Sequence, residues 1–134
     1  MSPIYLIDDQ PIANFITKKL LEVEGYKENI QDFTNPLEAF AIVEQEKKNA
    51  LIFLDLNMPE MTGWEFLEEM RRKGVAHKTI ILTSSTSELD QQKAIDYPWV
   101  VEYVVKPLNK EKFKLLSSYL KPYSKNGNFR SIPD

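Results

Sequence analysis

Six polar side chains fall where short apolar runs of the sequence end. They are Asp8, Asp9, Asp55, Thr83, Ser84 and Lys106, at the ends of the runs 3–9, 50–56, 78–85 and 99–107. A charge buried alone in such surroundings costs several kcal/mol unless something nearby requires it. The residue types together indicate a site rather than scattered surface charges.

The chemistry of this set is that of phosphoryl transfer. Clustered carboxylates repel one another and have raised pKa values unless a cation lies among them. No His or Cys accompanies them, so a hard divalent ion with oxygen ligands fits better than zinc. Mg²⁺ commonly uses one or two carboxylates, which leaves a third free as a nucleophile. Lys106 and Thr83 would hold the oxygens of a phosphoryl group during its transfer to an aspartate.

Alternation of strands and helices positions these residues. Apolar runs predict five strands, at 3–9, 28–33, 50–56, 78–85 and 99–107. Amphipathic segments between and after them predict five helices. Parallel strands need crossover helices, so the pattern predicts an α/β fold, a parallel sheet covered on both faces. Ligands of such sheets bind outside the carboxyl ends of the strands, where the six polar residues lie.

Each helix has its own sequence signals. Pro11 suits a first turn and Gly25 an end, and the Asn35–Pro36 pair opens the second helix. Ser87 and Asp90 resemble a capping box for the fourth helix, and Pro122 stops the fifth. The expected apolar faces are Ile12, Phe15, Ile16, Leu20 and Val23; Leu37, Phe40 and Ala41; Trp64, Leu67 and Met70; Leu89, Ala94 and Ile95; and Phe113, Leu116 and Leu120.

Composition narrows the function further. The 134 residues suit one domain, 1–122, followed by a tail, 123–134, that we expect to be flexible. The net charge of -3 argues against a nucleic-acid surface. The chain has no cysteine and no apolar run long enough to cross a membrane, so we expect a cytoplasmic protein without a membrane partner.

The chain resembles the receiver domain of bacterial two-component response regulators, the CheY-like superfamily, over about residues 3–120. The resemblance is carried by four motifs in order: Asp8–Asp9, "DLNMP" at 55–59 followed by Gly63, Thr83–Ser84, and "KP" at 106–107. It implies a doubly wound, flavodoxin-like (βα)5 sheet in strand order 2-1-3-4-5.

The resemblance also implies a role for each site residue. Asp55 accepts a phosphoryl group from a histidine kinase or histidine phosphotransfer protein. Mg²⁺ is bound by Asp9, Asp55 and the Asn57 backbone carbonyl, with Asp8 acting partly through water. Further implied residues are Lys106 on a phosphate oxygen, Thr83, Ser84 and Tyr103 in the switch, Asn57 and Ser85 in phosphoryl lifetime, and Pro107 after a cis peptide bond.

Some residues depart from the family pattern or have no role in it. Glu102 and Trp99 stand where many receivers have glycine, and Tyr97 and Trp99 are unusually bulky for the segment before the fifth strand. They predict an exposed patch for a particular partner, or for homodimer formation, on the face of helix four, strand five and helix five. His77, in a charged loop, is expected to be solvated.

Three functions compete at this point. A signalling receiver passes its output to a downstream protein, or relays phosphate onward, and catalyses only its own phosphorylation and dephosphorylation. No output domain follows in the sequence, which favours a stand-alone receiver. A phosphatase with an aspartate nucleophile commonly has a second aspartate where this chain has Asn57. A flavodoxin-like flavin module needs a Ser/Thr/Gly-rich loop where this chain has "DDQP".

Overall fold

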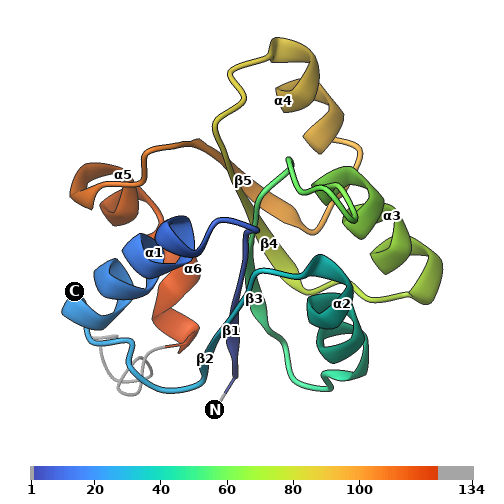
Figure 1. Cartoon of the computed structure of the whole chain (residues 1–134). Helices are drawn as coiled ribbons and strands as arrows, with labels where there is room; N and C mark the ends of the chain where they lie inside the picture. Colours follow the sequence, from blue (N-terminus) through green and yellow to red (C-terminus); the bar gives the residue numbers. More distant parts are fainter. Residues whose placement is uncertain (1, 124–134) are drawn as a thin grey trace.

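Five parallel strands form a single sheet in the order β2-β1-β3-β4-β5, as expected. The computed structural model describes residues 2–123 (Figure 1). The strands are β1 (Ile4–Ile7), β2 (Ile30–Phe33), β3 (Leu51–Leu54), β4 (Lys78–Thr83) and β5 (Val100–Val105). Each lies within its predicted apolar run; β1, β3 and β5 end before the polar site residues that follow them, whereas β4 ends on Thr83.

Helices cover both faces of the sheet (Figure 1). They are α1 (Pro11–Val23), α2 (Pro36–Gln45), α3 (Gly63–Lys73), α4 (Glu88–Ala94), α5 (Lys110–Leu115) and α6 (Ser117–Leu120), followed by a 3₁₀ turn, Lys121–Tyr123. Figure 1 shows α1, α5 and α6 on one side of the sheet and α2, α3 and α4 on the other. Crossovers of this kind are what a parallel sheet requires.

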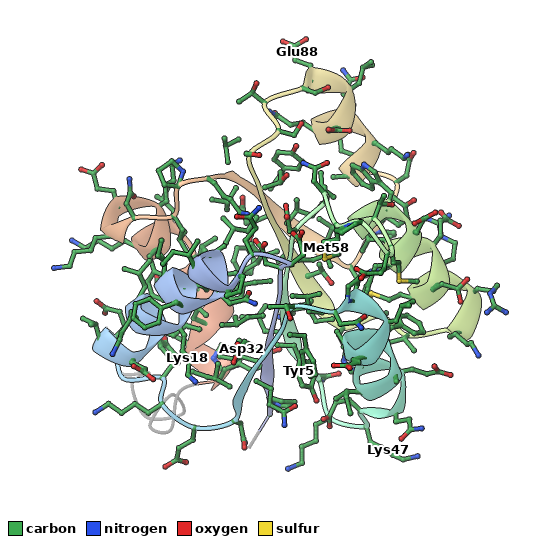
Figure 2. The ribbon with its side chains drawn as sticks, in the orientation of Figure 1. Tyr5, Lys18, Asp32, Lys47, Met58 and Glu88 are labelled. Atoms are coloured by element: carbon green, nitrogen blue, oxygen red, sulfur yellow. The ribbon has the colours of Figure 1, made fainter. Side chains whose placement is uncertain are left out.

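The core has two layers because successive strand residues point to opposite faces. Tyr5 and Ile7 of β1 belong to the cluster beneath α2 and α3, whereas Ile4 and Leu6 belong to the cluster beneath α1 and α5. Strands buried on both sides account for the continuous apolar runs in the sequence. In Figure 2, Tyr5 and Met58 lie over the sheet while Lys47 and Glu88 lie at the periphery.

Three of the predicted helix faces, those of α1, α2 and α4, are wrong at some of their positions. Ile12, Phe15 and Ile16 are exposed, and α1 instead buries Asn14, Thr17 and Leu21. In α2, Phe40 is buried as expected, but Leu37 and Ala41 are exposed, and the helix faces the core through Ala39 and Val43. The apolar residues of α1 do not mark its inner side because two of its buried residues are polar and internally hydrogen-bonded.

Helix α4 has little apolar contact with the rest of the fold. Ala94 is buried, but Leu89 and Ile95 are each 78% exposed. Ser87 is its N-cap, accepting from the Asp90 N–H at 3.3 Å. The reciprocal half of the predicted capping box is absent among the described residues, because the Asp90 carboxylate accepts from the Ser85 hydroxyl at 2.6 Å instead. A complete box, which sequence reasoning missed, starts α3 with Thr62 and Glu65.

The predicted last helix is divided into α5 and α6, although Phe113, Leu116 and Leu120 are buried as expected. Tyr123, predicted to begin a flexible tail, is 4% exposed and packs in the cluster beneath α1 and α5. The packed domain therefore extends at least to this residue. The rest of the predicted tail, 124–134, lies outside the described residues.

His77 was expected to be solvated, and this is wrong. It is 8% exposed, and its Nδ1 accepts a hydrogen bond from the Ala50 N–H at 3.1 Å. Its Nε2 lies 3.2 Å from the Val43 carbonyl oxygen. Nδ1 is therefore unprotonated and Nε2 carries the hydrogen. The imidazole joins the end of α2 to the start of β3, in a segment whose charged neighbours hide this role.

No helix within residues 2–123 is both long and apolar enough to span a membrane.

Candidate functional site

The register of the sheet brings the predicted site residues to one rim. Ile7 pairs with Leu54, and Leu54 with Ile81, so β1, β3 and β4 end side by side. The Asp55 N–H continues the ladder by donating to the Ile7 carbonyl at 3.0 Å. At the next strand, the Lys106 N–H donates to the Thr83 carbonyl at 2.7 Å. The four strand ends that sequence reasoning linked are thus held together by backbone hydrogen bonds.

Three carboxylates meet at this rim. Asp8, Asp9 and Asp55 each place a ligand oxygen within 4.8 Å of the others, with Asp8 and Asp55 buried and Asp9 half-buried. The Lys106 ammonium donates to Asp8 at 2.6 Å and lies 3.8 Å from Asp55 Oδ2. One cation therefore faces three acidic groups within this part of the chain.

Burial raises the pKa of Asp55 above its usual value, and the neighbouring charge of Asp8 raises it further. The Lys106 ammonium and the backbone N–H groups of Leu56 and Asn57 oppose this rise in pKa. The Leu56 N–H donates to Asp55 Oδ1 at 2.8 Å. An added cation that bound the rim would relieve the repulsion that Lys106 leaves uncompensated.

The donor set fits Mg²⁺. All three side chains offer carboxylate oxygens, and no His or Cys belongs to the cluster. Mg²⁺ prefers such ligands and keeps part of its water shell, which a partly open rim allows. Asn57, whose carbonyl was predicted to be a further ligand, is exposed and lies two residues after Asp55 in the β3–α3 loop.

A buried amide that sequence reasoning missed holds the β1–α1 loop. Asn14 Nδ2 donates to the Asp8 carbonyl at 3.1 Å and to the Phe33 carbonyl at 3.0 Å. The Gln10 N–H meanwhile donates to Asp8 Oδ1 at 2.9 Å. These bonds fix both the backbone and the carboxylate of Asp8. The sequence gives no local signal for this role, because α1 also carries the polar residues Thr17, Lys18, Lys19 and Glu22.

Gly63 is required where the β3–α3 loop returns to the site. Its N–H donates to the Leu56 carbonyl at 2.9 Å. A Cβ at this position would lie 2.5 Å from the Asp55 carbonyl oxygen and 2.8 Å from Leu56 Cα, both backbone atoms. Only glycine allows α3 to start this close to the acceptor strand.

The predicted switch residues are connected to one another. Thr83 is fully buried, and its Oγ1 accepts from the Ser85 N–H over a long 3.4 Å. The Tyr103 hydroxyl donates to the Ser85 carbonyl at 3.0 Å. Ser84 is exposed. The Lys106–Pro107 peptide bond is cis, as predicted.

Tyr97 and Trp99 do not form the exposed patch that was predicted. Tyr97 is buried, stacks on Trp64 and donates to Glu68 at 2.8 Å. Burial, then this bond to Glu68, raises the pKa of Tyr97 to about 12. Trp99 is partly buried against Tyr97, and Arg71 lies over both rings. The aromatic side chains therefore pack the β5 edge against α3.

Comparison with known proteins decides the family. A model of the response regulator receiver domain matches residues 4–116. The chain belongs to this family. This receiver domain is 32% identical over 93 residues to the nitrate/nitrite response regulator protein homolog of Haemophilus influenzae, covering 69% of the chain and 44% of that protein. It is 29% identical over 121 residues to the transcriptional regulatory protein MalR of Bacillus subtilis, covering 89% and 50%.

Solved structures agree with the fold. The receiver domain matches response regulator TrrA from Thermotoga maritima, in complex with Mg²⁺–BeF, with TM-score 0.71 and 30% identity over 90% of this chain and 99% of that one. It matches a CheY-like receiver domain protein from Methanospirillum hungatei with TM-score 0.76 and 26% identity, covering 92% and 96%. The chain spans about half the length of the two curated relatives.

Proposed function

We propose that this receiver domain takes a phosphoryl group onto Asp55 from a phosphohistidine and thereby changes a protein-binding surface. The observation that carries the proposal is the buried Asp55 carboxylate, within 4.8 Å of two further carboxylates and 3.8 Å from the Lys106 ammonium. An acid with a raised pKa beside a lysine and a metal-ligand set is what an activated carboxylate nucleophile needs.

In this proposal, Mg²⁺ is bound by Asp9, Asp55 and the Asn57 carbonyl, with Asp8 acting partly through water. When bound, the ion neutralises charge on the phosphoryl oxygens. An Asp55 oxygen forms a bond to phosphorus while the phosphorus–nitrogen bond of the donor histidine breaks. The imidazole nitrogen keeps the electron pair of that bond and takes up a proton.

Lys106 then exchanges partners. Its ammonium binds Asp8 at 2.6 Å and already lies near Asp55. We infer that it turns to an oxygen of the phosphoryl group, because that group carries more charge than the carboxylate it replaces. Thr83 gives its hydroxyl to another oxygen, and Asn57 and Ser85 affect how long the phosphoryl group survives. Catalysis extends only to the domain's own phosphorylation and dephosphorylation.

The direct test uses a small acyl phosphate. The protein is incubated with acetyl phosphate and Mg²⁺, and intact mass is measured for the wild type, for Asp55→Asn and for the exposed control Asp32→Asn. We expect the wild type and the control to gain one phosphoryl group and the Asp55 variant to gain none. Equal gain by the Asp55 variant, or none by the wild type, would remove Asp55 from the mechanism.

The donor is proposed to be a histidine kinase or histidine phosphotransfer protein that docks beside this rim. Ile12, Phe15 and Ile16 expose apolar surface on α1, and a hollow between α1 and the Lys106–Pro107 loop lies next to them. Phe15→Glu should slow transfer from a phosphorylated histidine phosphotransfer domain and leave phosphorylation by acetyl phosphate unchanged. If the variant took phosphoryl groups from the phosphotransfer domain as fast as wild type does, the donor would have to dock elsewhere.

Output is proposed through the face of α4, β5 and α5, either to a downstream protein or to a second copy. Leu89, Ile95 and Leu115 are each 78% exposed on or beside these helices. Phosphorylation should shift the NMR resonances of Thr83 and Tyr103, and sedimentation would reveal any dimer. Unchanged resonances would remove the switch. We place the protein in the cytoplasm, where histidine kinases hold their phosphoryl groups.

A further inference from the structure

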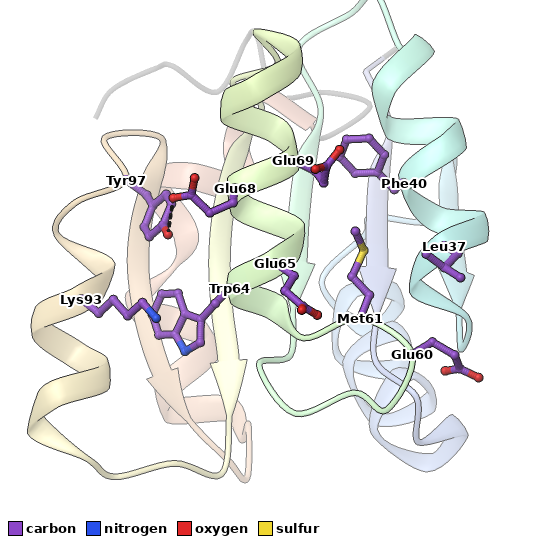
Figure 3. Close-up of a pocket in the computed structure, with 10 residues that line it drawn as sticks. All are labelled: Leu37, Phe40, Glu60, Met61, Trp64, Glu65, Glu68, Glu69, Lys93 and Tyr97. Atoms are coloured by element: carbon purple, nitrogen blue, oxygen red, sulfur yellow. Dashed lines mark hydrogen bonds between the residues drawn. The ribbon is translucent and has the colours of Figure 1, made fainter.

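A hollow of about 680 Å³ lies over α3 (Figure 3), and none of the residues that line it belongs to the acidic rim. Leu37 and Phe40 of α2 and Met61 and Trp64 at the start of α3 provide its apolar lining. Leu37 is 53% exposed, and Met61 and Trp64 are partly buried. Apolar side chains therefore remain accessible in a concave surface, as at sites where proteins bind one another.

The charges around this hollow are not balanced. Four glutamates and one lysine line it. Arg71 and Arg72 pair with two of the glutamates, Glu68 and Glu69. Glu60 and Glu65 form no salt bridge with any residue from 2 to 123, and they lie beside Met61 in Figure 3. The half of the hollow between α2 and α3 thus combines an apolar floor with two carboxylates that have no salt-bridge partner within residues 2–123, although one Glu65 oxygen accepts from the Thr62 N–H at 2.9 Å.

We propose that this hollow binds a cationic amphipathic segment of another protein, an apolar side chain contacting Leu37 and Met61 while neighbouring Lys or Arg side chains pair with Glu60 and Glu65. The lysine of the lining, Lys93, does not compete for these acids, because its ammonium lies 4.8 Å from the centroid of the Trp64 ring at the other end. Opposite charges on the segment and on the rim of the hollow would speed their association and fix the position of the segment relative to the apolar contact.

A second copy of the chain fits less well. Its α1 carries exposed Ile12 and Phe15 near Lys18 and Lys19, so it has the right chemistry. However, the hollow and α1 are different surfaces of the molecule. A contact between the hollow of one copy and α1 of the next would join the copies head to tail, into an open chain unless a ring closes. The proposed site is also separate from the acidic rim, so it stands whether or not Asp55 is phosphorylated.

The test is an NMR titration of the full chain with a defined probe. The probe is a helical peptide of Leu and Lys in an amphipathic pattern, acetylated and amidated, with a counterpart carrying Glu in place of Lys. We expect the cationic peptide to shift the resonances of Leu37, Met61 and the Trp64 indole, and the acidic peptide to leave them in place.

Matched variants separate this site from general attraction to an acidic protein. Glu60→Gln with Glu65→Gln removes two charges, and glutamine still serves the capping position of residue 65. Glu88→Gln with Glu111→Gln removes two exposed first-turn charges elsewhere. The first pair should weaken binding at least about fivefold, as two ion pairs of ordinary strength would, and the second less than about twofold.

Three results would overturn the proposal. The first is equal weakening by both variant pairs. The second is a set of shifts centred on α1 or α4, or no shift at millimolar peptide. The third is movement of the Leu37 and Met61 resonances with protein concentration alone, accompanied by a rising sedimentation coefficient, which would make a second copy the occupant.

Discussion

Replacing Asp55 by asparagine should stabilise the metal-free protein at neutral pH. Asparagine keeps the shape of the side chain and can still accept from the Leu56 N–H, a bond of 2.8 Å. It removes a charge that is buried beside Asp8, whose own carboxylate remains paired with Lys106 at 2.6 Å. The substitution therefore removes an electrostatic cost without leaving an unpaired group.

The expected gain in the free energy of unfolding follows from the opposing interactions of the Asp55 charge with its neighbours. Ligand oxygens of Asp8 and Asp55 lie within 4.8 Å of each other, so the two carboxylates repel by at least about 3.5 kcal/mol at an effective dielectric constant of about 20. Lys106, 3.8 Å from Asp55, attracts it by about 4.4 kcal/mol on the same scale. Burial is the largest cause of the raised pKa of Asp55 and the repulsion from Asp8 is the second, and the attraction from Lys106 offsets only part of the two. We expect a gain of about 1–2 kcal/mol in the free energy of unfolding.

The gain must depend on pH in a defined direction. The native pKa of Asp55 lies above its ordinary value of 3.8, so native wild type binds more protons than unfolded wild type between the two values. The cost of the charge is complete at pH values above the raised pKa. It decreases as pH falls through that pKa and is absent below about 3.8. The difference between variant and wild type should therefore shrink on acidification.

Urea unfolding in EDTA, followed by circular dichroism from pH 7.5 to pH 4, measures this difference. In thermal melts under the same conditions, the midpoint temperature of the variant should be about 3–8 °C higher than that of wild type at neutral pH. Added Mg²⁺ should reduce the difference in stability between the variant and wild type. The ion binds the complete carboxylate set of native wild type more tightly than that of the variant, so it stabilises wild type more. Asp32→Asn, on the exposed edge strand, should change stability by less than about 0.5 kcal/mol. A metal-free Asp55 variant less stable than wild type at pH 7.5 would refute the reasoning.

Two further substitutions test the framework around the site. Gly63→Ala should cost about 1–3 kcal/mol and slow phosphorylation by acetyl phosphate, because the added Cβ would lie 2.5 Å from the Asp55 carbonyl oxygen; unfolding like that of wild type would contradict this. His77→Ala should cost about 1–3 kcal/mol in urea unfolding at pH 7.5, because it leaves the buried Ala50 N–H unpaired; the Val43 carbonyl loses one of its two contacts but still accepts from the Glu46 N–H. Lys78→Ala, at the exposed neighbouring residue, should unfold like wild type. Equal losses of stability in the two variants would show that the hydrogen bonds of the imidazole do not stabilise the fold.

The sequence was sufficient for the sheet and the rim because both depend on repeating local signals. Each site residue directly follows an apolar run, and parallel strands bring such positions to one edge. Thr83 and Lys106 are 23 residues apart, yet the register places them next to each other. When the strand order is known, the sequence therefore predicts which residues at the strand ends lie close together.

The failures concern polar residues that are buried and satisfied. Asn14 and Thr17 face inward on α1, each bonded to a backbone carbonyl, so the apolar pattern of that helix points to the wrong side. His77 is likewise buried with both ring nitrogens next to backbone partners. Burial of a polar group costs little once it is hydrogen-bonded. Thr17 bonds locally to the Ala13 carbonyl, but Asn14 reaches the Phe33 carbonyl and His77 accepts from the Ala50 N–H, partners that no local pattern reveals.

The hydrogen bonds around Ser85 indicate how a change at Asp55 would reach α4. The bond from the Ser85 N–H to Thr83 Oγ1 is long, at 3.4 Å, so little is lost when Thr83 turns toward a phosphoryl oxygen. The bond from the Ser85 hydroxyl to Asp90 is 2.6 Å and charge-assisted, and should persist. Movement of the loop would then carry the first turn of α4 with it. Because few apolar contacts hold α4 in place, we expect a rearrangement that begins at the Thr83 hydroxyl to be enough to reposition Leu89.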